Sequence, residues 1–218
     1  MPRRPAALPR SSTAGALAAL ATIACALAPA ARGAEAESAG AASRVRVDTT
    51  LGSFIIELDT LRAPLTTANF LGYVRRDFYA GTVFHRVIAN FVAQGGGYDE
   101  KYTLRPTEPP VANESGSGLS NKRGTVGLAR SDAPHSGNAQ FYVNLNDNDA
   151  LDPTPLRWGY AVFGRVVDGI EVVERIGHTP TGTAGPFPEH APLEPVVIRR
   201  IEVISPAAVP PAALPPKG

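Results

Sequence analysis

The sequence Phe84-His85-Arg86-Val87-Ile88 leads, after two residues, into Phe91-Val92-Ala93-Gln94-Gly95-Gly96-Gly97. This stretch combines one guanidinium group, on Arg86, and one amide, on Gln94, with a cluster of apolar side chains. His85 is its only titratable base and has no nucleophile or acid beside it. The glycines end the run where the backbone turns or passes close to another group. These side chains can bind a peptide and polarise a carbonyl group, but they do not form a hydrolytic site.

Four further motifs accompany this stretch, one before it and three after it. They are Ala63-Pro64-Leu65-Thr66-Thr67-Ala68-Asn69-Phe70, Gly124-Thr125-Val126-Gly127-Leu128-Ala129-Arg130, Asn138-Ala139-Gln140-Phe141-Tyr142-Val143 and Tyr160-Ala161-Val162-Phe163-Gly164-Arg165-Val166. In their order and approximate spacing, the motifs make residues 44–204 resemble the cyclophilin family of peptidyl-prolyl cis/trans isomerases. Within that family, the chain is most similar to the compact periplasmic cyclophilins of Gram-negative bacteria.

The composition fits one domain of ordinary size. Without its two ends, the 218-residue chain is still long enough to build a single hydrophobic core. The 21 lysines and arginines nearly balance the 20 aspartates and glutamates, so no net field would recruit nucleic acid. The single cysteine, Cys25, lies near the N-terminus, so the folded part is expected to have neither a disulfide nor thiol chemistry.

Residues 1–34 have the pattern of a secretory signal peptide. Three arginines within the first ten residues precede a short apolar run at 14–27. Small residues favour cleavage near Ala30 or Ala36, and the apolar run is shorter than the roughly 20 residues that span a bilayer. We therefore expect export to the periplasm and no membrane span in the mature protein.

Two other kinds of export signal were weighed against this prediction. Arg3-Arg4 is compatible with twin-arginine export, although the residues that follow lack the rest of that motif. Cys25 is compatible with a lipoprotein, although the residues before it are a poor lipobox and the apolar run continues past it. A plain cleaved signal peptide fits the leader best.

Past the leader, we expect a linker at 35–43, a folded domain at 44–204, and a disordered Pro/Ala-rich tail at 205–218. Alternation of apolar residues with a period of two predicts eight strands in the domain. They span 45–47, 54–58, 82–87, 91–94, 125–129, 141–145, 160–167 and 196–204. Helical spacing predicts one helix that begins at Pro64 and a second that follows Gly169.

Many short strands and only two helices favour a mainly β fold whose sheet closes on itself and leaves no exposed edge. Periodicity alone does not separate a barrel from a sandwich. The cyclophilin resemblance implies a closed eight-stranded antiparallel barrel capped by two α-helices.

The chemistry that the resemblance implies is rotation about prolyl peptide bonds. Rotation about a peptide bond is opposed by about 18–20 kcal/mol, because the nitrogen lone pair is delocalised into the carbonyl group. Xaa-Pro bonds populate both isomers but exchange slowly enough to limit folding. A catalyst needs no covalent step. It needs a dry apolar pocket for the proline ring and a donor for the twisted amide, a role that the rigid, always charged guanidinium fork suits.

The resemblance assigns roles to ten residues, with Arg86 as the catalytic donor. The proline pocket would be formed by Phe91, Val92, Tyr142, Leu151 and Tyr160. Gln94 and Gln140 would hold the substrate backbone, and Ala129 and Arg130 would form the edge of the groove. Without the resemblance, ordinary core packing would explain the apolar residues, and a surface position would explain the two glutamines.

Four positions depart from the pattern of the best-known eukaryotic members. Val92 replaces a methionine, Tyr142 a phenylalanine and Tyr160 a histidine, and Ala150 stands where a tryptophan is usual. The Tyr142 hydroxyl would need a hydrogen-bond partner within the pocket. Because that tryptophan supplies much of the family's contact with cyclosporin, we expect weak cyclosporin binding.

Other chemistries do not fit the residue spacing. Ser131, Asp132 and His135 are too close in sequence for a catalytic triad, whose members assemble in space. The segment 146–152 resembles half a calcium-binding loop but lacks the required glycine and terminal glutamate, so we expect a polar loop. The four histidines show no ligand spacing, and no metal or cofactor is expected.

Two classes of function remain. The first is a monomeric prolyl isomerase that acts on unfolded, proline-containing exported chains. The second is a binding module or holdase chaperone that uses the same groove without turnover. Arg86 favours the enzyme, because a pure binder has no need of a donor aimed at the prolyl nitrogen. The role of residues 98–122 stays open.

Overall fold

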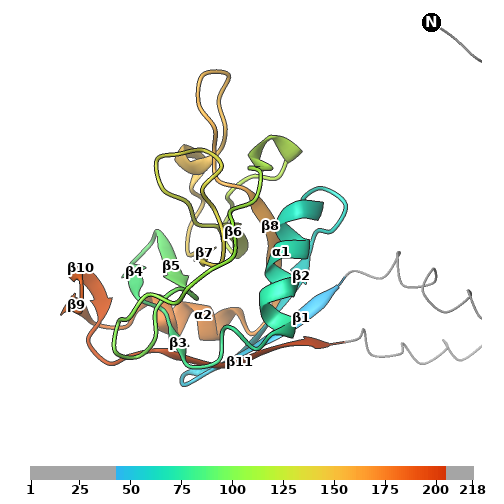
Figure 1. The fold of residues 1–218 in the computed structure, drawn as a ribbon. Coiled ribbons are helices and arrows are strands. Elements are labelled where there is room, and N and C mark those ends of the chain that lie inside the picture. The colour runs from blue at the N-terminus through green and yellow to red at the C-terminus, as the bar shows by residue number, and fades with distance from the viewer. Residues whose placement is uncertain (1–42, 205–218) are drawn as a thin grey trace, which may run out of the picture. The chain divides into compact units, whose positions relative to one another are not determined.

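A computed structural model describes residues 43–204 (Figure 1). The strands are β1 (Arg44–Thr49), β2 (Gly52–Leu58), β3 (Thr82–Val83), β4 (Arg86–Ile88), β5 (Val92–Gly95), β6 (Thr125–Leu128), β7 (Phe141–Asn144), β8 (Val162–Asp168), β9 (Thr181–Ala184), β10 (Phe187–Pro192) and β11 (Val197–Ile204). The helices are α1 (Pro64–Arg75) and α2 (Ile170–Gly177), with 3-10 turns at Ser115–Ser117 and Asp149–Leu151. The predicted signal peptide and tail, and all but the last residue of the predicted linker, lie outside the described residues.

Nine strands form one curled antiparallel sheet in the order β3-β11-β1-β2-β8-β6-β7-β5-β4. Its concave face buries apolar side chains, and α1 packs into it through Phe70, whose ring lies 5.2 Å from that of Phe163 and 5.6 Å from that of Phe141. The second helix buries Val172, Val173 and Ile176 and packs against β2, β4 and β5. The predicted mainly β fold with two helices is confirmed.

The predicted closed barrel of eight strands is not observed, because the run predicted at 82–87 is two strands. β3 pairs with β11, whereas β4 pairs with β5, so the two halves of this run end the sheet order at opposite edges. The Phe84 N–H donates to the Val196 carbonyl (3.0 Å), so the pairing with the β11 side of the sheet extends to Phe84 before β4 begins. The described sheet is therefore open and has nine strands.

The start of α1 is stabilised from a distant segment. Pro64 occupies the first turn, as predicted, but the N-cap residue Ala63 has no side-chain acceptor. The Glu114 carboxylate fills that role, accepting hydrogen bonds from the backbone N–H groups of Leu65 (3.0 Å) and Thr66 (2.8 Å). A negative charge at this end of a helix is also favourable to the helix dipole. Part of the 98–122 segment thus has a structural role that the sequence did not indicate.

The β9–β10 hairpin was not predicted. Only Ala191 and Pro192 of its strand residues are buried, so the hairpin lacks the buried alternation that identified the other strands. The hairpin nevertheless contributes to the structure, because the Phe187 ring stacks on His85 (5.1 Å) and packs edge-on against Tyr98 (5.0 Å).

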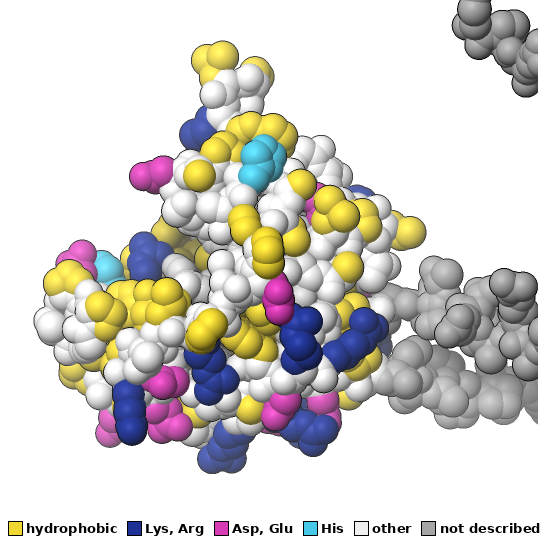
Figure 2. Space-filling view, viewed as in Figure 1, with side chains coloured by type: hydrophobic (Ala, Val, Ile, Leu, Met, Phe, Trp, Pro, Cys, Tyr) yellow, Lys and Arg dark blue, Asp and Glu magenta, His cyan; other side chains and the backbone are white. Residues whose placement is uncertain are grey.

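Charged side chains of both signs are interspersed on the face in view, over the region of β1 and β11 (Figure 2). Ion pairs there join Arg46 to Asp48 (2.8 Å) and Arg200 to Glu202 (2.9 Å). Exposed pairs of this kind contribute only about 0–1 kcal/mol each. Their mixture means that this face presents no large region of a single sign.

Candidate active site

The site is built on one row of residues that crosses four strands. The strand register places Arg86 opposite Gln94, Gln94 opposite Tyr142, and Tyr142 opposite Gly127. Directly paired residues project from the same face of a sheet. The guanidinium, the amide and the phenol therefore lie side by side, although they are far apart in the sequence.

A pocket of about 380 Å³ opens above this row. Phe91 comes from the turn between β4 and β5, Leu151 from the 3-10 turn at Asp149–Leu151, and Tyr160 from the segment before β8. The full lining consists of Arg86, Phe91, Val92, Gln94, Ala129, Arg130, Tyr142, Leu151 and Tyr160. Nine of the ten residues assigned from the sequence thus surround one cavity. The tenth, Gln140, does not line it.

Gln140 instead belongs to a hydrogen-bonded chain that orients Arg86. The Arg86 Nη1 donates to Gln94 Oε1 (3.3 Å), and the Gln94 Nε2 donates to Gln140 Oε1 (3.0 Å). Within residues 43–204 the Arg86 side chain makes no other hydrogen bond. Its remaining N–H groups are thus available to a carbonyl or amide placed in the pocket.

Tyr142 forms the floor of the pocket, and its hydroxyl has the partner that the sequence required. The hydroxyl donates to the Asn121 Oδ1 at 2.6 Å, and only 3 % of the residue is exposed. Burial raises the pKa of Tyr142 well above its usual range, so the hydroxyl stays protonated as a donor. The ring crosses Gly127 so closely that a side chain there would overlap the phenol.

The wall beside Tyr160 is held by Arg130. The guanidinium of Arg130 lies 4.3 Å from the centre of the Tyr160 ring, a cation–π arrangement. Its N–H groups also donate to the carbonyls of Gly159 (3.1 Å) and Trp158 (2.8 Å). Ala150 is exposed and does not line the pocket, so this position contributes no aromatic surface to it.

His85, next to Arg86 in sequence, is not placed to act as a base. It is 1 % exposed and packs between the rings of Tyr98 (4.7 Å) and Phe187 (5.1 Å). Burial, assisted by the charge of Arg86, lowers the pKa of His85 from 6.5 to about 4. The residue is therefore neutral at pH 7 and serves as a core side chain.

The low pKa of His85 predicts a pH-dependent stability. Between pH 6.5 and about 4 the unfolded chain binds a proton that the folded chain does not, so acidification favours unfolding. The free energy of unfolding should fall by about 3 kcal/mol across that window because of this residue. Urea unfolding at several pH values should show the loss, and His85→Phe, which keeps the ring stacking but cannot titrate, should reduce it. An equal loss in His85→Phe would contradict the assignment.

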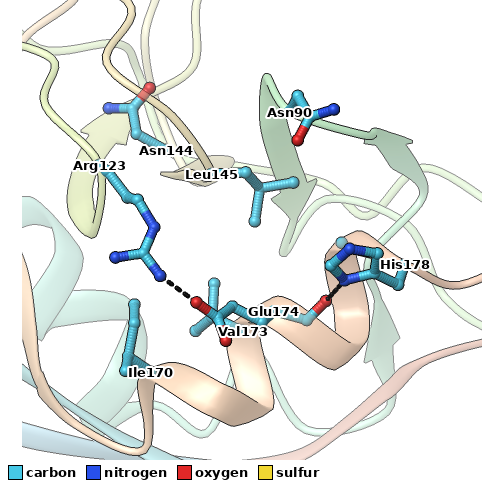
Figure 3. Close-up of a pocket in the computed structure, with 9 residues that line it drawn as sticks. Asn90, Arg123, Asn144, Leu145, Ile170, Val173, Glu174 and His178 are labelled. Carbon is cyan, nitrogen blue, oxygen red and sulfur yellow. Dashed lines mark hydrogen bonds and ion pairs between the residues drawn. The ribbon is translucent and has the colours of Figure 1, made fainter.

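A second cavity of about 150 Å³ lies between the end of β7 and α2 (Figure 3). Its rim carries an ion pair between Arg123 and Glu174, and the His178 Nδ1 lies 2.7 Å from the Glu174 carbonyl oxygen. Leu145 and Val173 contribute apolar surface. None of the ten assigned residues lines this cavity.

The acidic segment that resembled half a calcium loop is partly neutralised by neighbouring cations. The Lys122 Nζ lies 2.6 Å from Asp149 and 3.5 Å from Asp147, and the Asp147 carboxylate also accepts the backbone N–H of Arg123 (2.9 Å). Among the described residues, no group of three His, Cys, Asp or Glu side chains is arranged to hold a metal ion. Over the same range, no helix is long and apolar enough to cross a membrane.

A pocket with apolar and aromatic walls on a curled antiparallel sheet, with the Arg86 fork free to donate at its edge, defines a class of protein that can bind a peptide without covalent chemistry. Comparison with known proteins is consistent with this geometry. Residues 44–203 match the model of the family described as "Cyclophilin type peptidyl-prolyl cis-trans isomerase/CLD". The chain belongs to this cyclophilin-type family and is a peptidyl-prolyl cis–trans isomerase.

Relatives among curated proteins agree over most of their length. A peptidyl-prolyl cis-trans isomerase of Acinetobacter baylyi is 42% identical over 161 residues, which are 74% of this chain and 85% of the relative. Isomerase B of Escherichia coli is 43% identical over 162 residues, 73% of this chain and 98% of the relative. A cyclophilin of Cryptosporidium parvum has a similar fold, with a TM-score of 0.63, 23% identity, and coverage of 76% of this chain and 99% of that one.

Proposed function

We propose that this isomerase holds the proline ring of a peptide in the pocket floored by Tyr142, and that Arg86 stabilises the twisted amide. The observation that carries the proposal is the position of Arg86 on the pocket edge, oriented by Gln94 and with N–H groups to spare. In the twisted state the nitrogen becomes pyramidal and its lone pair is free to accept a hydrogen bond. A donor preorganised for that state lowers the barrier without forming a covalent bond.

The pocket walls supply the second half of the mechanism. Phe91, Val92, Leu151 and Tyr160 surround the floor with apolar and aromatic surface, which excludes water and holds the ring still. Gln94, which lies beside the donor and donates to Gln140 behind it, would hold the peptide backbone. With the ring fixed on one side of the bond and the donor on the other, rotation is confined to the prolyl amide.

The proposal extends to the kind of substrate. A structure of the Cryptosporidium parvum cyclophilin was obtained in the presence of the dipeptide Ala-Pro, and its fold is similar to that of this chain, with a TM-score of 0.62. This supports proline-containing polypeptides as substrates here. We propose that the protein acts on them as a monomer. Turnover should be measured with a proline tetrapeptide in a protease-coupled assay. Tight binding of the peptide without turnover would favour the holdase alternative.

We further propose that the protein belongs to the periplasmic Gram-negative branch and acts on exported chains. The support is the leader pattern of residues 1–34, together with the bacterial origin of several relatives. Mass spectrometry of the exported protein is expected to find an N-terminus near Ala30 or Ala36. A lipid on Cys25, or an uncleaved chain in the cytoplasm, would overturn this proposal.

Cyclosporin binding is expected to be weak, because position 150 carries an exposed alanine in place of the family's tryptophan. Ala150→Trp should strengthen binding roughly tenfold or more, since a buried aromatic adds about 1–3 kcal/mol of apolar contact. Turnover of a proline peptide should change much less, because Ala150 does not line the proline pocket. A calorimetric titration of both proteins tests this. Tight binding by the unmodified protein would refute it.

A further inference from the structure

Three asparagines with almost no exposed surface lie directly behind the proline pocket. Asn121 and Asn144 are 0% exposed, and Asn148 is 8% exposed. A buried amide is costly unless its donors and acceptors are satisfied. The partners of these three side chains therefore show what the cluster does.

Asn121 is at the centre of the cluster and connects three parts of the pocket. Its Oδ1 accepts the Tyr142 hydroxyl (2.6 Å) and the Asn144 Nδ2 (3.2 Å). Its Nδ2 donates to the Asp152 Oδ1 (2.8 Å) and to the Tyr160 carbonyl (3.4 Å). The Asn121 backbone N–H donates to the same Asp152 oxygen at 2.7 Å.

Asn148 extends the cluster to the remaining wall. Its Nδ2 donates to the Phe91 carbonyl (2.9 Å) and to the Asn144 Oδ1 (2.7 Å). The cluster thus reaches the floor through Tyr142, the wall next to Leu151 through Asp152, and the walls of Tyr160 and Phe91 through their carbonyls. These four segments come from different parts of the chain and are joined here by one set of hydrogen bonds.

The chemistry of position 121 requires an amide. One end of the side chain must accept from a phenol, and the other must donate to a carboxylate, which neither an aspartate nor a leucine can do at neutral pH. The segment that resembled a calcium loop supplies two of the partners. Asp147 and Asp149 face Lys122, whereas Asn148 and Asp152 take part in the buried cluster.

We propose that Asn121 is a positioning residue of the isomerase site, which fixes the spacing between the floor and the walls of the proline pocket. The inference rests on the proposed function and deepens it. Asn121 contacts neither Arg86 nor the reacting bond. Its loss should therefore weaken binding of the proline ring and leave the Arg86 donor in place. The substitution should therefore raise KM and the peptide Kd, and should change kcat, the turnover rate of bound substrate, very little.

The test compares Asn121→Ala with the unmodified protein, using a proline tetrapeptide below the thermal transition. KM, and the peptide Kd from a titration, should rise roughly tenfold, while kcat stays within about threefold. Val45→Ala provides a stability control, because Val45 is a fully buried core residue of β1 that does not line the pocket. It should lower the melting temperature without changing KM.

Tyr142→Phe keeps the test decisive if Asn121→Ala fails to fold, since it removes only the hydroxyl link. The KM of Tyr142→Phe should rise a few-fold. The KM of the double variant, with both substitutions, should not exceed that of Asn121→Ala alone. The proposal would be overturned by an unchanged KM in Asn121→Ala, or by an equal rise of KM in Val45→Ala. If Asn121→Ala does not fold, an unchanged KM in Tyr142→Phe would overturn it instead. Absence of turnover in the unmodified protein would instead contradict the proposed function.

Discussion

Arg86→Ala is expected to lower kcat on the order of 10²–10³-fold, the usual cost of removing one preorganised donor from a site that stabilises a polar transition state. The peptide Kd should change little, because the pocket walls that hold the proline ring remain in place. Partial exposure of the side chain means that the melting temperature should stay close to that of the unmodified protein. Protease-coupled turnover and a peptide titration measure the two effects separately.

Arg86→Lys is the matched variant, since it keeps the positive charge and loses the fork. An ammonium group cannot contact Gln94 and a substrate amide with the same fixed geometry, so activity should fall roughly tenfold or more. Turnover near that of the unmodified protein in Arg86→Lys would show that charge alone suffices. The same result in Arg86→Ala would remove Arg86 from the mechanism.

Gly127→Ala is expected to have the second large effect, because the new methyl group would overlap the phenol of Tyr142. Either the ring leaves the pocket floor and breaks its bond to Asn121, or β6 shifts away from β7. Overpacking of this kind usually costs about 1–3 kcal/mol of stability. The peptide Kd should rise roughly tenfold or more, since the ring that supports the proline is displaced.

Gly116→Ala is the control for this substitution. A methyl group there would meet no atom within 4 Å, and the residue lies outside the pocket. It should leave both stability and peptide binding near their original values. Unchanged peptide binding in Gly127→Ala, measured by the same titration, would mean that Tyr142 does not form the working floor of the site.

Much of the site could be predicted because its residues lie in short motifs with strong local patterns. Arg86 and Gln94 are only eight positions apart in the first motif, on two runs that the sequence predicts as strands, and the register of β4 and β5 places them opposite one another. Pro64 likewise indicated where α1 begins, since a proline fits the first turn of a helix. The outcome for the pocket as a whole, nine lining residues of ten assigned, depended on the family resemblance as well.

The features that the sequence missed have two physical causes, bonds between distant segments and the lack of a local pattern. The division of the 82–87 run reflects the pairing of β3 with β11, more than a hundred positions away, which no local pattern contains. The Glu114 cap of α1 spans 48 positions, and the β9–β10 hairpin has little buried alternation to identify it. The Asn- and Asp-rich segment 146–152 was the one available sign of the buried cluster, but the sequence analysis interpreted it as a polar loop.

Residue identity alone indicates the groups that this protein can use: an arginine fork, two glutamines and a set of apolar and aromatic side chains on alternating strands. How these groups are held depends on contacts between distant segments. Asn121 reaches Tyr142 across 21 positions and Asp152 across 31, and such bonds exist only once the register of β6 and β7 and the loop after β7 are fixed. A hydrogen bond requires its donor and acceptor to lie within about 3 Å of each other and to be aligned. Residue identity supplies the donor and the acceptor, but only the packing of the folded chain brings them to that distance.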